Sequence, residues 1–171
     1  MSHAKARGLV SVLAVVGALT VPAAAAAAPP SPGPDIDFVL PAGVACADFD
    51  LRLTASGGKR QSHTFVDRNG NVVRLLETGT GSALTFTNEE TGESVSFKSN
   101  GSVARTTVNP DGTQTVQLTG HTVIILFPTD VPAGPSTTLV AGRIVFTVDQ
   151  AEVFTVQQIS GQQTDICALL S

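Results

Sequence analysis

Turn-forming pairs of residues cut most of this chain into short segments, and their spacing limits the fold more than any other feature of the sequence. Gly-Gly, Asn-Gly and Asp-Gly pairs and similar turns recur at intervals of roughly 9–12 residues, and such pairs supply the positive φ angles that tight hairpins need. Between the turns, apolar and polar residues alternate, as Phe49, Leu51 and Leu53 do, and no helical period persists. Threonine, whose branched β-carbon favours extended backbone, is frequent in these segments. The pattern predicts an all-β fold.

The turns divide the chain into about 8–10 strands, which we expect to form an antiparallel meander. The predicted strands cover 48–54, 61–67, 71–78, 82–88, 93–98, 102–108, 113–119, 121–127, 138–148 and 152–159. Because nearly every connection is short enough for a hairpin, including Gly79-Thr80-Gly81, we expect the meander to close into a barrel-like fold. A two-sheet β-sandwich is the alternative. Residues 123–127 are apolar at both parities, which predicts a strand covered on both faces.

The first 28 residues differ in composition from the rest and read as a secretory signal peptide. Lys5 and Arg7 precede an apolar stretch from Leu9 to Thr20, and Pro22 and a run of alanines follow. We therefore expect cleavage near the end of this leader and secretion by the general secretory route. An uncleaved membrane anchor is the alternative, but the alanine-rich end is too weakly apolar for a stable span. After cleavage, no stable membrane insertion is expected.

The leader also sets the expected organisation of the remaining chain. Residues 29–45 are rich in proline and are expected to form an extended N-terminal tether. Residues 46–171 are then a single all-β domain, because this length suits one domain and not two. The chain has 10 Lys and Arg against 14 Asp and Glu, and two of the basic residues lie in the leader. This acidic balance argues against a nucleic-acid partner.

The two cysteines lie at opposite ends of the predicted domain. Cys46 precedes the first predicted strand and Cys167 follows the last. In an exported protein this placement predicts one disulfide that joins the two ends. In the chain-entropy description, closing so long a loop stabilises the fold by roughly 5 kcal/mol as an upper value. Two free thiols are the weaker alternative, because neither cysteine has a neighbouring His or Lys.

Candidate functional residues are few. His63 and Phe65 share one parity of a predicted strand, and we expect them to point inward and to line a ligand site. His121 follows Gly120 at a predicted strand start. Either histidine, with an acid such as Asp67 or Asp130, could serve a hydrolase, but no sequence motif assembles a catalytic set. We therefore assign no catalytic residue and expect no cofactor or metal site. The absence of Trp and Tyr argues against binding of sugars.

Three stretches of the chain carry a resemblance to known proteins. The phrase from Gly120 to Thr138, the turn Asn-Pro-Asp-Gly-Thr at 109–113 and the alanine-rich leader resemble small exported proteins of high-GC Gram-positive actinobacteria, which have no assigned activity. The resemblance implies export from such a cell. It transfers no catalytic residue to this chain.

These observations predict a secreted, non-enzymatic β-domain that binds a small apolar ligand or a protein partner at the surface. This prediction rests on the expected all-β barrel, whose inward residues are apolar, and on the absence of an assembled catalytic set in the sequence. A secreted hydrolase that uses His63 or His121 is one alternative. A structural protein held at the cell envelope by the proline-rich tether is another.

Overall fold

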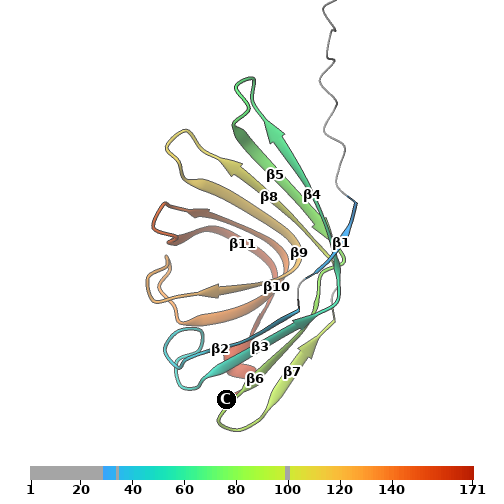
Figure 1. Cartoon of the computed structure of the whole chain (residues 1–171). Coiled ribbons are helices and arrows are strands. Elements are labelled where there is room, and N and C mark those ends of the chain that lie inside the picture. The colour runs from blue at the N-terminus through green and yellow to red at the C-terminus, as the bar shows by residue number, and fades with distance from the viewer. Residues whose placement is uncertain (1–28, 34, 99–100) are drawn as a thin grey trace, which may run out of the picture.

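The computed structural model describes residues 29–33, 35–98 and 101–171, and over these residues the chain forms two antiparallel sheets and one short helix (Figure 1). In spatial order, the first sheet contains β1 (Ser31–Pro32), β4 (Lys59–Val66), β5 (Val72–Gly79), β8 (Ser102–Val108), β9 (Gln114–Leu126), β10 (Ser136–Val148) and β11 (Phe154–Asp165). The second sheet contains β2 (Ile36–Leu40), β3 (Leu51–Ser56), β6 (Ala83–Asn88) and β7 (Ser94–Phe97). The helix α1 (Ile166–Leu169) follows β11. The predicted all-β class is confirmed.

The predicted barrel is wrong, and the two-sheet alternative fits the described residues. Both sheets are open, because β1 and β11 form the edges of the first sheet and β2 and β7 those of the second. The chain also passes repeatedly between the sheets: Gly57-Gly58 connects β3 to β4, and residues 80–82 connect β5 to β6. The segment Gly79-Thr80-Gly81 is therefore a crossing between sheets and not a hairpin. Glycine permits a sharp bend of a strand as readily as a reversal, so the sequence signal is the same for both.

A row of glycines bends the longest strands of the first sheet. Gly120 of β9 pairs with Gly142 of β10, and Gly142 pairs with Gly161 of β11. Gly120 and Gly161 have φ angles of 113° and 104°, in the region that favours glycine. A β-carbon on Gly120 would lie 2.6 Å from the carbonyl oxygen of Gly101. Because the glycine bends the strand without ending it, the two strands predicted on either side of Gly120 are one continuous strand, β9.

The bend gives the first sheet two arms, which Figure 1 shows as a U-shaped curve of β9, β10 and β11. We call residues 121–126 and 136–141 the near arm, because they pack on the second sheet, and residues 114–119 and 143–148 the far arm. One core lies between the near arm and the second sheet, and its members include Leu51, Phe86, Leu139 and the half-buried Val123 and Ile125. The other core fills the inside of the bend and contains Ile124, Leu126, Val140, Ile144 and Phe146.

The near arm is thus covered on both faces, as predicted for residues 123–127. Val123 and Ile125 face the first core, whereas Ile124 and Leu126 face the second. The prediction fails only at Phe127, which is 37% exposed at the end of the strand. A strand whose side chains alternate between two cores must be apolar at every position.

Residues 29–45 are not the free tether that we expected. Ser31 pairs with Arg60 at the edge of the first sheet, and Ile36–Leu40 pairs with β3 along its full length. Proline is compatible with such edge positions because its missing N–H can face away from the neighbouring strand. The predicted signal peptide, residues 1–28, lies outside the described residues. Within the described residues, no helix is long and apolar enough to cross a membrane.

The predicted disulfide between Cys46 and Cys167 is confirmed. It joins residues 121 positions apart and places α1 against the first core, where Ile166 and Leu170 are buried. A hydrogen bond supports the same junction: the Asn88 side-chain amide donates to the carbonyl oxygen of Leu170 at 2.9 Å.

Candidate functional site

The concave side of β4, β5 and β8 continues the inside of the bend but carries no covering arm. The register shows this continuity, because Leu118, which packs on the second core, pairs with Ala104, and Ala104 pairs with Glu77. We call this surface the open face. Its residues are Arg60, Ser62, Thr64 and Val66 of β4, Leu75 and Glu77 of β5, and Ser102, Ala104, Thr106 and Val108 of β8.

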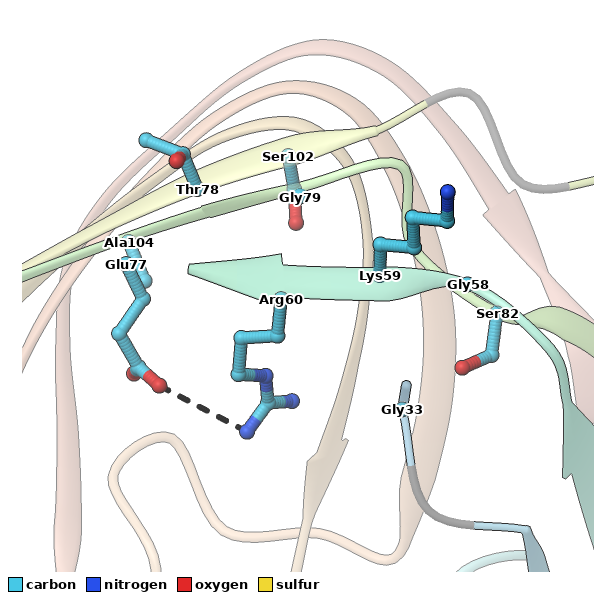
Figure 2. Close-up of a pocket in the computed structure, with 11 residues that line it drawn as sticks. Gly33, Gly58, Lys59, Arg60, Glu77, Thr78, Gly79, Ser82, Ser102 and Ala104 are labelled. Atoms are coloured by element: carbon cyan, nitrogen blue, oxygen red, sulfur yellow. Dashed lines mark ion pairs between the residues drawn. The ribbon is translucent and has the colours of Figure 1, made fainter. Parts of the chain in front are cut away.

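The end of the open face next to the glycine row is polar. An Arg60 Nη1 atom lies 3.6 Å from Oε1 of Glu77, and the Ser62 hydroxyl donates to the same oxygen at 3.5 Å. Arg60 and Glu77 border a depression of about 120 Å³, whose wall also includes Lys59, Ser82, Ser102 and the backbone of several glycines. Figure 2 shows Arg60 and Glu77 pointing into this depression, whereas the side chain of Lys59 points to the opposite side of the sheet.

The arrangement supplies both kinds of hydrogen-bonding group. The guanidinium of Arg60 has five N–H donors and its side chain is 61% exposed, so it retains donors for a ligand. The carboxylate of Glu77 is 28% exposed and accepts only. A polar group that carries both a donor and an acceptor could therefore bind between these two side chains.

The other end of the open face is apolar. Val66 is 57% exposed and Val108 is 40% exposed, and Leu75 lies half-buried on the strand between theirs. By contrast, Ile144 and Phe146 belong to the core inside the bend, which the near arm covers, and they are only 1% and 6% exposed. The same apolar surface is thus covered at β9 and β10 and uncovered at β4, β5 and β8. Together with the polar end, it forms a surface whose polarity changes along the strands.

His63 and Phe65 do not point inward, whereas their expected role in lining a ligand site stays a prediction. Their parity on β4 is opposite to that of Ser62, which places both on the convex side of the sheet. Their rings contact each other edge to face with centroids 4.5 Å apart, and the guanidinium carbon of Arg74 lies 5.6 Å from the Phe65 centroid. Both parities of this strand are largely polar, so the sequence did not reveal which side is concave. His63 borders a separate depression of about 190 Å³ on the convex side.

The acids that a hydrolase would need are engaged in loop structure. The Asp67 carboxylate accepts from the backbone N–H groups of Asn69 at 2.7 Å and Asn71 at 2.9 Å. A hydrogen bond from the Asn71 side-chain amide, together with these backbone bonds, holds the pKa of Asp67 below its ordinary value. Asp130 is buried and accepts from the N–H groups of Phe127 and Phe154.

His121 occupies the start of the near arm. It pairs with Ala141 in the ladder between β9 and β10, and its backbone N–H donates to the carbonyl oxygen of Gly101 at 3.3 Å. In the part of the chain that the structure describes, no cluster of three or more His, Cys, Asp or Glu side chains is arranged to hold a metal ion.

Known proteins supply no guide to this site. Neither protein-family models nor curated proteins nor solved structures contain a match to this chain. Sequence reasoning also missed Arg60 and Glu77, although both belong to predicted strands or border them. Arg60 pairs with Gly79 and Glu77 pairs with Ser62, so their ion pair is a diagonal contact between β4 and β5. It depends on strand register, and the turn at Asp67–Asn71 was the one local signal that could have supplied that register.

Proposed function

We propose that this protein is a non-enzymatic binding domain whose open face binds an amphiphile with an uncharged polar head group. The observation that carries the proposal is the change of polarity along the open face, from Arg60 and Glu77 to Val66 and Val108. The disulfide supports action outside the cytoplasm, where such bonds persist. The acids Asp67 and Asp130 stabilise loops, which favours binding over the hydrolase alternative.

The head group follows from the paired charges at the polar end. Arg60 and Glu77 neutralise each other, so a charged head would satisfy one of them and leave the other without its partner. A neutral group with a hydroxyl or an amide can accept from Arg60 and donate to Glu77 at the same time. An acylglycerol has this chemistry.

The apolar chain of the amphiphile would lie along the strands, from the head group toward Val66, Leu75 and Val108. The seven residues from Arg60 to Val66 extend about 20 Å, since each of the six steps between them rises about 3.3 Å. The depression of about 120 Å³ holds only the head group, because sites that enclose a whole small molecule usually measure about 300–1,000 Å³. The apolar chain of the ligand therefore binds to an open surface and not in a lumen. This differs from the enclosed ligand site that a barrel would have provided.

Calorimetric titration with three amphiphiles of equal chain length tests the proposal. Monododecanoylglycerol, dodecanoate and dodecyltrimethylammonium are each titrated below their micellar concentration. We expect the neutral acylglycerol to bind most tightly. Arg60→Ala should weaken its binding about tenfold, the effect of losing one hydrogen bond to a charged group.

Arg105→Ala is the matched control, because it removes a cation of β8 that lies outside the depression, at the parity opposite to Ala104. It should leave the affinity unchanged. Absence of binding by all three amphiphiles, or equal losses in the two variants, would contradict the proposal.

A further inference from the structure

The strand β11 is an edge that the fold leaves open to pairing. Exposed edge strands attract further strands unless they are short, charged or interrupted by proline. In the described residues, β1 has two residues and contains a proline, and β7 has four residues. β2 has five residues and ends directly before Pro41. By contrast, β11 has 12 residues and carries no charge from Phe154 to Thr164.

One end of the free edge of β11 is already covered. The Val131 N–H donates to the carbonyl oxygen of Phe154, and the Val156 N–H donates to that of Val131, both at 2.7 Å. Phe154 and Val156 thus direct these groups away from β10. In an antiparallel ladder, the backbone N–H and C=O groups of successive residues point alternately toward and away from the neighbouring strand. The bulge near Val156 shifts this alternation by one residue, so the backbone groups of Ile159, Gly161 and Gln163 also point away from β10.

The shape of the edge restricts what can pair with it. Each long strand of this sheet has its bend opposite the bend of its neighbour, as the pairs Gly120–Gly142 and Gly142–Gly161 show. An added strand must therefore bend opposite Gly161 to follow both arms. A straight peptide cannot do this, whereas β11 of a second copy does so when its Gly161 faces the first.

We propose that β11 pairs antiparallel with β11 of a second copy about a two-fold axis at Gly161. In this register Gln157 lies opposite Asp165, so pairing begins just after the residues that Val131 covers and ends at the last residue of the strand. The uncovered edge is thus symmetric about Gly161, as a two-fold contact requires. The segment is also uncharged up to Thr164, so no like charges meet near the axis.

The register brings Ser160 opposite Gln162 of the second copy. Both residues are exposed. Their position is a non-hydrogen-bonded pair, in which opposed side chains approach most closely. Charges introduced at these two positions therefore test the register itself.

Sedimentation equilibrium of the full chain is the experiment. We expect the unaltered protein to form a dimer. The double variant Ser160→Lys/Gln162→Lys places lysine opposite lysine and should weaken the dimer at least tenfold. The double variant Ser160→Lys/Gln162→Glu places lysine opposite glutamate and should restore it. Ser94→Lys, an exposed position on the edge strand β7, should have no effect.

Circular dichroism of each variant separates loss of pairing from loss of folding, and Gln162→Lys alone replaces the first variant if that variant does not fold. An unaltered protein that remains a monomer up to about 1 mM, the weak limit of specific association, would overturn the proposal. Equal weakening by the Lys/Lys and Lys/Glu variants would also overturn it, because the effect would then not depend on the register.

Discussion

Asp130 shows how one side chain can join two parts of the molecule. Its carboxylate is 4% exposed and accepts from Phe127 N at 2.7 Å and from Phe154 N at 2.9 Å, so it fastens the loop after β9 to the start of β11. Asp149 forms a similar pair of bonds, to Ala151 N and Val153 N, in an exposed hairpin. The two acids differ mainly in burial, which makes them a matched pair.

We expect Asp130→Ala to lower the free energy of unfolding by about 2–4 kcal/mol, because it leaves two N–H groups near the core without an acceptor. Asp149→Ala should cost about 1 kcal/mol or less, because water can replace the carboxylate. Urea unfolding followed by circular dichroism measures both, since the chain has no Trp for fluorescence. Equal losses in the two variants would show that burial is not the deciding factor.

Three exposed carboxylates are expected to make the stability of the fold depend on pH in the acidic range. Hydrogen bonds from Asn71 lower the pKa of Asp67, the side chain of Thr113 lowers the pKa of Asp111, and the guanidinium of Arg52 lowers that of Asp37. A carboxyl whose pKa is lower in the folded state stabilises the fold above its ordinary pKa, about 3.9, and this contribution is lost as the pH falls through the lowered value.

The urea midpoint should therefore fall as the pH is lowered below about 4, the ordinary range for Asp. In Asp67→Asn, which cannot ionise, this fall should be shallower than in the unaltered protein. Measurement of the midpoint at several acidic pH values tests this. An identical slope in the two proteins would mean that Asp67 does not contribute.

The elements of this fold were predictable where the signal is local. The bounds of β8 agree with the predicted strand 102–108, and the hairpin at Asn109–Thr113 lies where its turn residues predict it. Glycines that bend a strand could not be distinguished from glycines that reverse it. The distinction depends on the neighbouring strand, because Gly120 bends only in register with Gly142. The face to which His63 points depends on the same register.

The glycine row predicts a contrast between two alanine substitutions. Gly120→Ala combines a positive φ with a close approach to the backbone of Gly101, so it should cost about 3 kcal/mol or more. Gly70→Ala has a positive φ of 85° but meets nothing within 4 Å, so it should cost only about 1–2 kcal/mol. Urea unfolding compares the two, and similar losses would contradict a steric role for the row.

At the scale of the whole molecule, the disulfide connects the first core to the end of the chain. A loop of 121 positions is long, and the loss of unfolded-state entropy on closing it corresponds to about 4–5 kcal/mol as an upper value. The sequence predicted this pair because only two cysteines are present and they lie at opposite ends of the domain. Arg60 and Glu77 had no such signal, since their proximity follows from the fold.

Cys46→Ala/Cys167→Ala should therefore lower the free energy of unfolding by several kcal/mol, up to the value above. Treatment of the unaltered protein with a reductant should lower it by a similar amount. Denaturant midpoints with and without reductant provide the test. If reductant also shifts the midpoint of the double variant, the effect does not come from this bond.

In the binding mode that we propose, the bend at the glycine row leaves the concave side of β4, β5 and β8 open for a ligand. The most direct test is nuclear magnetic resonance of the isotopically labelled protein during titration with monododecanoylglycerol. Backbone shifts should change at Arg60, Glu77, Leu75 and Val108 and remain constant on the second sheet. Shifts that cluster around His63 and Phe65 on the convex side, or no shifts at all, would contradict the claim.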